Sequence, residues 1–281
     1  MRIISRICAS LEARLSQPWL NPWRTVYFCL RTMPLRVAVK LPVFIYGRVR
    51  LFGLNGRVEF EGTPVKTGMV KIGINSESFG LFDHSGFVQL GSPGARLVFE
   101  GPAMVSVNCK LRVVSGTLRM GAFAYLGEGI RVVVNGSSVS VGAYCRIAYE
   151  TVIMNSGFHH VWNSNRQSVT RTTRPVTIGD YCWIGNRTSI SPGAALKHHS
   201  IVCAGSLVNK DFTAAEGEYQ MLGGSPAKVI GCGFHRVYSP DFERRVSRWF
   251  REHPDENTFH LEEFDDTVGD LPKEFFQRVW C

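Results

Sequence analysis

The sequence lacks an uninterrupted apolar stretch long enough to span a membrane. Its most apolar stretch, residues 35–46, contains Arg36, Lys40 and Pro42, whereas a membrane-spanning helix needs about 20 consecutive apolar residues. A secretory signal is also missing, because no clean apolar stretch near the N-terminus precedes a small-residue cleavage site. We therefore expect a cytoplasmic protein.

The sequence also lacks paired cysteines. Its eight cysteines include no C-x-x-C pair, and this absence argues against a zinc finger or a similar metal site. Scattered cysteines of this kind are typical of reduced thiols in a cytoplasmic protein.

Acidic residues are scarce in the N-terminal segment, residues 1–50. This segment holds nine basic residues and one acid, Glu12, so it carries +8 of the formal net charge of +9. Aromatic residues such as Trp19, Trp23 and Tyr27 lie between the basic ones. The mixture suits peripheral contact with an anionic membrane, at the inner face in a cytoplasmic protein, or a basic strap over the end of the core. Nucleic acid is disfavoured because no nucleic-acid module accompanies the charge.

A repeat of six residues is the main signal that is present. Aliphatic residues recur every six positions without a break, and small residues stand two positions before them. The aliphatic set is Ile178, Ile184, Ile190, Leu196, Val202 and Val208, and the small set is Cys182, Thr188, Ala194, Ser200 and Ser206. The same rule holds at Val141, Ile147 and Ile153, and more loosely at Val114, Met120, Leu126 and Val132. Ile72 and Leu90 stand 18 residues apart and predict one earlier turn of the same kind.

A period of six fits neither an α-helix nor a hairpin meander. It fits a chain wound into a three-sided prism, in which each side is a short strand that points one aliphatic residue inward. Successive coils then pair in parallel and satisfy each other's backbone groups. The repeat therefore predicts an all-β protein with a parallel β-helix.

The motifs within the repeat resemble those of the hexapeptide-repeat acyltransferases, and most closely the sugar and surface-polysaccharide O-acetyltransferases. The similarity rests on residues 178–185 (IGDYCWIG), 191–193 (SPG), 204–211 (AGSLVNKD) and 224–228 (GSPAK), and it covers about residues 139–231. The resemblance implies a left-handed parallel β-helix, a homotrimer, and active sites in the clefts between subunits.

The repeat is interrupted between Ile153 and Ile178, and we take residues 155–175 as a loop that leaves the prism. A long loop on a regular scaffold is usually functional or disordered. The resemblance implies a catalytic histidine here, and His159, in Ser156-Gly157-Phe158-His159, occupies that place. Its neighbour His160 is the second candidate. A histidine suits the reaction because its pKa near 6.5 allows it to act first as base and then as acid.

The resemblance also implies an acetyl-CoA donor, used as a substrate, and no metal. Lys210 and Lys228 match basic positions that would contact the phosphates of coenzyme A. Asn186 and Ala204 match positions that line the pantetheine arm, and Trp183 would wall the thioester end.

The acceptor implied by the resemblance is a glycan of a capsule, exopolysaccharide or O-antigen. Galactoside-type and maltose-type enzymes carry a sugar-binding Asn about thirty residues before the histidine. Here the matching coil, residues 125–129 (YLGEG), has none, so a simple free disaccharide is disfavoured. Glu128 either contacts a different glycan or sits at a solvated corner.

Three parts are expected: the basic aromatic segment 1–50, the β-helix 51–231 and a C-terminal helical extension 232–281. Residues 241–253 have helical spacing after Ser239-Pro240 and predict a helix that packs on the open end of the prism. Two other functions remain open. One is a γ-type carbonic-anhydrase-like metalloenzyme, although no third histidine joins His159 and His199 in phase. The other is a non-catalytic trimeric scaffold.

Overall fold

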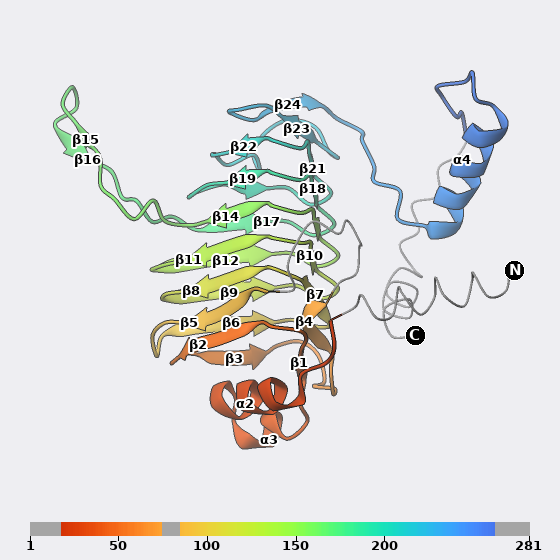
Figure 1. Cartoon of the computed structure of the whole chain (residues 1–281). Coiled ribbons are helices and arrows are strands. Elements are labelled where there is room, and N and C mark those ends of the chain that lie inside the picture. The colour runs from red at the N-terminus through yellow and green to blue at the C-terminus, as the bar shows by residue number, and fades with distance from the viewer. Residues whose placement is uncertain (1–17, 75–84, 262–281) are drawn as a thin grey trace, which may run out of the picture.

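The computed structural model describes residues 18–74 and 85–261. The described chain winds into a three-sided prism of stacked coils (Figure 1). Consecutive strands pass from one face to the next, and each strand pairs in parallel with the strand one coil later. The sequence-based prediction of a parallel β-helix is confirmed.

Each face of the prism is one sheet. Face 1 holds β1 (Val43–Ile45), β4 (Val70–Ile74), β7 (Ala103–Ser106), β10 (Tyr125–Leu126), β13 (Arg146–Ile147), β18 (Trp183–Ile184), β21 (Ile201–Val202), β23 (Met221–Gly223) and β24 (Lys228–Gly231). Face 2 holds β2 (Arg50–Leu54), β5 (Phe87–Leu90), β8 (Lys110–Val113), β11 (Arg131–Val134), β14 (Val152–Met154), β19 (Ser189–Ile190) and β22 (Leu207–Val208). Face 3 holds β3 (Arg57–Phe60), β6 (Ala95–Phe99), β9 (Gly116–Met120), β12 (Ser137–Val141), β17 (Val176–Ile178) and β20 (Ala195–Leu196).

The coils differ in length along the prism. Late coils hold 18 residues, as in the pairing of Trp183 with Ile201, and middle coils hold 21, as in the pairing of Tyr125 with Arg146. The middle strands on faces 2 and 3 are four or five residues long, so a strand such as β11 buries two aliphatic residues, Val132 and Val134. The longer sides explain why the six-residue rule is loose there.

One sequence-based pairing is wrong. Ile72 and Leu90 stand 18 residues apart, but Ile72 pairs with Val105 on face 1, whereas Leu90 pairs with Val113 on face 2. The coil that contains them is longer than 18 residues, since Arg50 pairs with Phe87 one coil later.

The core is the column of inward side chains along the prism axis. Ile147, Ile184 and Val202 lie in register on face 1 and are fully or almost fully buried. The small corner residues are buried beside them, and their polar atoms bond to backbone carbonyls, as Thr188 Oγ1 does to Gly185 O at 2.8 Å and Ser206 Oγ does to Cys203 O at 2.7 Å. Truncating a core residue such as Ile184 to Ala should cost about 2–5 kcal/mol, because the surrounding coils cannot collapse into the gap.

The corner between faces 3 and 1 carries a column of stacked rings. Phe123, Tyr144, Tyr181 and His199 lie one above the other, with ring centroids 4.8–5.1 Å apart. All four have φ near +60°, a left-handed conformation that is costly for bulky residues. Stacking offsets part of that cost, since aromatic pairs contribute about 0.5–1.5 kcal/mol beyond their burial. His199 is therefore half-buried in a stack rather than an exposed turn residue.

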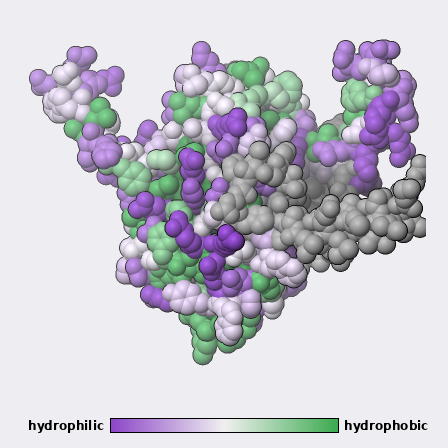
Figure 2. Space-filling view, in the orientation of Figure 1, coloured by the Kyte–Doolittle hydropathy of each residue, from purple (hydrophilic) through white to green (hydrophobic). Residues whose placement is uncertain are grey.

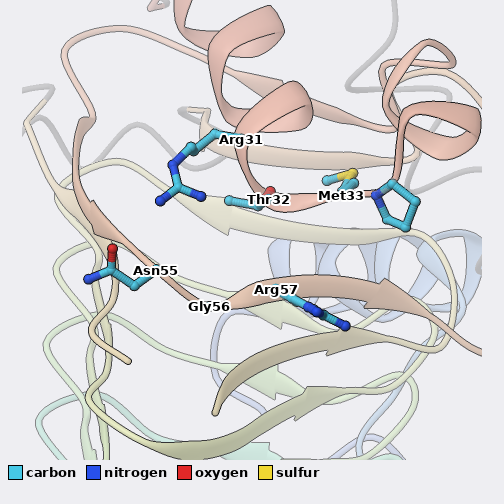
Figure 3. A pocket seen from close by; sticks show the side chains of 7 residues that line it. Arg31, Thr32, Met33, Asn55, Gly56 and Arg57 are labelled. Atoms are coloured by element: carbon cyan, nitrogen blue, oxygen red, sulfur yellow. The ribbon is translucent and has the colours of Figure 1, made fainter. Parts of the chain in front are cut away.

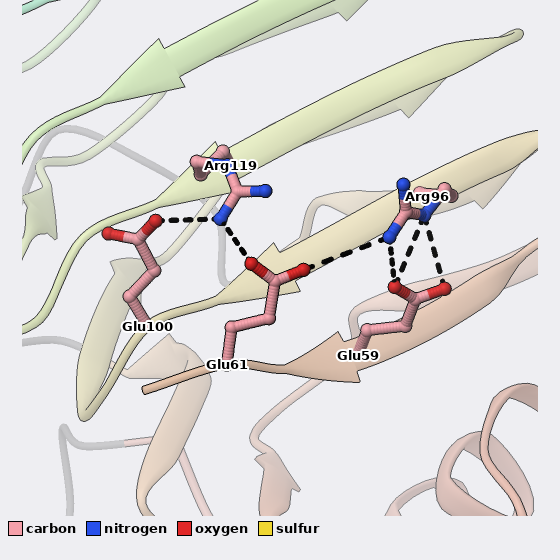
Figure 4. Close-up of polar contacts among 5 residues, drawn as sticks. All are labelled: Glu59, Glu61, Arg96, Glu100 and Arg119. Carbon is pink, nitrogen blue, oxygen red and sulfur yellow. Dashed lines mark hydrogen bonds and ion pairs between the residues drawn. The ribbon is translucent and has the colours of Figure 1, made fainter. Parts of the chain in front are cut away.

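The outer surface of face 3 carries a charged network near the start of the prism. Arg119 Nη1 lies 2.7 Å from carboxylate oxygens of both Glu61 and Glu100, and Arg96 pairs with Glu59 and Glu61 (Figure 4). These partly exposed pairs join three consecutive coils, since Glu59, Arg96 and Arg119 lie on β3, β6 and β9. Each exposed pair contributes little to the free energy of unfolding. We therefore interpret the network as favouring the observed register between β3, β6 and β9.

Helices α2 (Pro22–Thr32) and α3 (Leu35–Ala38) close the first coil at the lower end in Figure 1. Asn21 caps α2 by accepting a hydrogen bond from Arg24 N at 3.0 Å, and Pro22 follows at the first helical position. The buried face of α2 holds Phe28 and Cys29 against the core. Strand β1 begins at Val43, so coiling starts inside the N-terminal basic segment.

Helix α4 (Pro240–Glu252) confirms the predicted C-terminal helix but not its position. Figure 1 shows α4 beside the prism, away from the last coil, whose end is formed by β23 and β24. The apolar face of α4 packs on its own following segment, with the Trp249 and Phe259 ring centroids 5.2 Å apart. The predicted packing on the open end is therefore wrong. The expectations for residues 1–17 and 262–281 lie outside the described residues.

Candidate functional site

The predicted loop is an arm that leaves the corner between faces 2 and 3. It starts after β14, returns to β17 and carries the short antiparallel pair β15 (Trp162–Asn163) and β16 (Ser168–Val169) (Figure 1). The two sides of its base are joined by hydrogen bonds from Arg174 N to Asn155 O at 3.0 Å and from Thr173 Oγ1 to Ser156 Oγ at 3.1 Å. Asn135 N holds this base to the prism by donating to Asn155 Oδ1 at 2.8 Å. The prism thus fixes the base of the arm, whereas the rest of the arm is exposed to solvent.

His159 lies at the start of the arm and is exposed. Phe158 adopts φ of +61°, and its backbone N–H donates to Ser156 Oγ at 3.2 Å, so the chain turns sharply just before the histidine. His160 follows, also exposed. Within the described part of the chain, no side chain hydrogen-bonds the His159 imidazole. The exposed imidazole is therefore accessible to a ligand.

The corner between faces 1 and 2 brings together two of the predicted donor-site residues. Asn186 and Ala204 occupy this corner in consecutive coils, and Gly205 N donates to Asn186 O at 2.9 Å. The Asn186 amide donates from Nδ2 to the Tyr149 hydroxyl at 2.9 Å. Ala204 is exposed, so the wall beside the Asn186 amide is flat and open.

Lys228 and Trp183 flank that corner. The turn before Lys228 lies over the same corner, because Leu207 N donates to Gly224 O at 2.9 Å and Ala227 N to Leu207 O at 2.8 Å. Lys228 itself is exposed at the start of β24. Trp183 stands on β18, partly exposed, and the Arg236 guanidinium lies 5.3 Å from its ring centroid.

Lys210 lies elsewhere, at the corner between faces 2 and 3. Its Nζ lies 5.0 Å from the centroid of the Phe212 ring, and its side chain is exposed. The base of the His159 arm leaves the same corner two coils earlier, on β14 rather than β22, which is about 10 Å along the axis at the usual strand spacing.

The predicted residues thus form two groups. His159, His160 and Lys210 belong to one corner, whereas Asn186, Ala204 and Lys228 belong to the next, with Trp183 beside them. The width of face 2 separates the two groups within one chain.

Sequence reasoning missed Tyr149, Glu150 and Arg236. Tyr149 holds the Asn186 amide, and Glu150 pairs with Arg187 at 2.7 Å at the same corner. The repeat did offer a signal for Tyr149. Strands β13 and β18 pair in consecutive coils, with Arg146 opposite Trp183, so residues 149 and 186 occupy equivalent positions three residues further on. Arg236 lies beyond the repeat, so no periodic signal could have placed it on Trp183.

Glu128 does not sit at a solvated corner. Its side chain is buried between β10 and β11, and its charge helps to raise the pKa of the Cys109 thiol, although burial of the thiol is the larger cause. A buried carboxylate is not placed to contact a glycan from solvent. Neither of the two roles considered from the sequence describes it.

No group of three or more His, Cys, Asp or Glu side chains within residues 18–74 and 85–261 is arranged to hold a metal ion. His199, one of the two histidines considered for a carbonic-anhydrase-like site, stacks between Tyr181 and Tyr219. Its ring is therefore part of the aromatic column at the corner between faces 3 and 1. His159 lies at the corner between faces 2 and 3, so the two histidines do not converge on one site within a chain.

The fold belongs to the class of left-handed parallel β-helices. A solved structure of the polysialic-acid-specific acetyltransferase NeuO superposes with a TM-score of 0.54 at 18% identity, covering 76% of this chain and 84% of that one. A likeness at this identity concerns the fold alone, and it confirms the predicted handedness.

Three curated relatives of this chain are acetyltransferases by name, two of them O-acetyltransferases, so the resemblance seen in the motifs to the hexapeptide-repeat family is confirmed. An acetyltransferase of Saccharomyces cerevisiae is 33% identical over 115 residues, which are 39% of this chain and 56% of that protein. Galactoside O-acetyltransferase of Escherichia coli is 33% identical over 98 residues, which are 35% of this chain and 46% of that enzyme. Polysialic acid O-acetyltransferase of Escherichia coli is 27% identical over 111 residues, which are 40% of this chain and 35% of that enzyme.

The matches span about half or less of the length of these curated relatives. No protein-family profile matches the sequence.

Proposed function

We propose that this protein is an acetyl-CoA-dependent O-acetyltransferase that acts on a hydroxyl of a surface glycan. The observation that carries the proposal is the similarity to galactoside and polysialic acid O-acetyltransferases in a chain with their fold. Polysialic acid, the acceptor in the name of one relative, is a polymer. A polymeric acceptor agrees with the absence of the sugar-binding Asn from residues 125–129, which disfavours a simple free disaccharide.

In the proposed reaction, His159 removes the proton from the acceptor hydroxyl as its oxygen attacks the thioester carbonyl. The tetrahedral intermediate then collapses, the carbon–sulfur bond breaks, and the protonated imidazole returns its proton to the leaving thiolate. The products are the O-acetyl ester and free coenzyme A. General-base help of this kind typically contributes 10²–10⁴-fold.

The donor would lie along the corner between faces 1 and 2. Asn186 and Ala204 would face the pantetheine arm, Lys228 would contact a phosphate, and Trp183 would bound the thioester end. Lys210 would meet a phosphate from the other corner. Because the two corner groups are a face apart within one chain, we propose that His159 of one protomer completes the donor site of its neighbour in a homotrimer. We place this trimer in the cytoplasm, at the inner face of the membrane.

The test compares matched histidine variants. Acetyl transfer from acetyl-CoA to candidate glycans is read as a mass increase, and the melting temperature is measured with and without coenzyme A. We expect His159→Ala to lower transfer by about 10²–10⁴-fold while the shift in melting temperature is kept. His160→Ala should retain most of the activity. Transfer by His159→Ala at the rate of the unaltered protein would refute the role of this residue.

A further inference from the structure

Helix α2 has a buried stripe and an exposed apolar stripe on opposite faces. Its inward stripe, Thr25, Phe28, Cys29 and Thr32, is buried against β1 and the core. Its outward stripe, Trp23, Val26, Tyr27 and Leu30, follows the same helical spacing, and Trp23 is 84% exposed. One stripe is enough to seat a helix on a core. The second stripe stays 38–84% exposed, although Tyr27 lies beside a strand, where it lines a pocket with Leu51 and Phe52 of β2.

The outward stripe continues onto the neighbouring residues of the cap, which we define as residues 18–40. Trp19 is 75% exposed, Leu35 68% and Val39 63%. Figure 2 shows hydrophobic and near-neutral residues at the lower end of the molecule, where Figure 1 places α2 and α3. Exposed apolar side chains gathered at one end of a protein are typical of an interaction site, whereas single scattered ones are not.

Cationic side chains surround this apolar surface, and acids are missing from it. Residues 13–58 contain no Asp or Glu, and Arg31, Arg36 and Lys40 are exposed on the cap. The charge of residues 18–58 is therefore of one sign, and the next acids along the chain, Glu59 and Glu61, are paired with Arg96 and Arg119.

Two pockets beside α2 each hold a pair of arginines. The first, of about 460 Å³, lies between the end of α2 and the turn from β2 to β3, with Arg31 and Arg57 in its lining (Figure 3). The second, of about 520 Å³, includes Arg24 and Arg50. Neither lining contains an acid, so neither pocket repels an anionic group.

From this combination we infer that the α2–α3 cap docks on an anionic lipid bilayer. Trp and Tyr rings favour the headgroup level of a membrane, and basic side chains near an anionic surface add attraction. Docking between two caps is disfavoured, because a twofold contact would bring the same cations face to face. None of the described helices is long and apolar enough to cross a bilayer, so the contact is peripheral.

The docked orientation would set the height of the proposed reaction above the lipid. The order β2-β5-β8-β11-β14 on face 2 separates the cap from the His159 arm by four coil steps, or roughly 20 Å. This consequence rests on the proposed function, whereas the docking itself does not.

The test measures sedimentation of the full chain with vesicles of phosphatidylcholine alone or mixed with phosphatidylglycerol. We expect binding to the mixed vesicles only, and weaker binding at high salt. The stripe variant Trp23→Ser/Leu30→Ser and the charge variant Arg36→Glu/Lys40→Glu should each lower the affinity at least about tenfold. The controls Ile230→Ser and Arg112→Glu/Arg131→Glu alter exposed residues away from the cap and should bind as the unaltered protein does.

Three outcomes would overturn the docking. Equal vesicle binding by the cap variants and the controls would do so, as would no binding by the unaltered protein. A smaller oligomer for the stripe variant with unchanged vesicle binding would assign the cap to a contact between copies. Circular dichroism confirms folding of each variant, and the coenzyme A melting shift tests the proposed function separately. Loss of vesicle binding with the melting shift retained would concern the docking alone, whereas loss of the melting shift with vesicle binding retained would concern the proposed function alone.

Discussion

At the residue scale, four consecutive outward positions of face 1 are unusual because they are buried. Lys71, Met104, Tyr125 and Arg146 follow one another in register and alternate with the core residues, yet each is at most 7% exposed. Burial lowers the pKa of Lys71 to about 8 and that of Arg146 to about 10, with the charge of Arg236 as a smaller cause for Arg146. Both cations therefore oppose folding at neutral pH through their desolvation.

The pKa of Lys71 predicts a pH-dependent stability. Below pH 8 the folded and unfolded chains both hold the proton, so the burial penalty is fully present. Between pH 8 and the ordinary lysine pKa of 10.5 only the unfolded chain binds it, so the free energy of unfolding rises with pH. The stability of Lys71→Met minus that of the unaltered protein should then fall by on the order of 3 kcal/mol across this range. Denaturant titrations at several pH values measure it, and a constant difference would contradict the pKa.

At the scale of elements, the arm between β14 and β17 was predicted by the break in the repeat. Its internal hairpin was not predicted, because β15 and β16 are two residues long and pair only with each other. Val161 and Trp162 are exposed along it, whereas its base is tied to the prism by the hydrogen bond from Asn135 N to Asn155 Oδ1. The arm therefore adds little to the stability of its own protomer.

Shortening the arm should separate stability from activity. Replacing residues 162–169 with an Asn-Gly turn removes no buried side chain, so the melting temperature should change by less than about 4 °C. Acetyl transfer should fall about tenfold or more, because the proposed catalytic residue would lose its contact with a neighbouring protomer. A control keeps the length of the arm and changes only residues 164–167 to glycine and serine. Full activity of the shortened variant would show that the arm takes no part in the reaction.

At the scale of the whole molecule, the division of the candidate residues between two corners decides what kind of site is possible. One corner offers an imidazole and Lys210, and the next offers Asn186, Ala204 and Lys228. A closed ring of three copies brings unlike corners together, which a single prism cannot do.

Complementation tests this arrangement. The variant His159→Ala and the variant Asn186→Asp/Lys228→Glu should each be inactive or nearly so as the only chain. Co-expressed in equal amounts, they should restore about a quarter of the sites, since each site takes one corner from each of two neighbours. Light scattering checks that the mixed sample is a trimer. Activity that stays at the level of the separate variants would place the whole site within one chain.

The sequence by itself determined the coiling, because a six-residue spacing of aliphatic and small residues permits a three-sided prism and little else. It also located the arm and the C-terminal helix. Only the tertiary structure decided the length of the middle coils, the position of α4 and the burial of Glu128. Those features depend on which side chains meet across coils and at the ends of the prism, and such contacts leave no periodic trace along the chain.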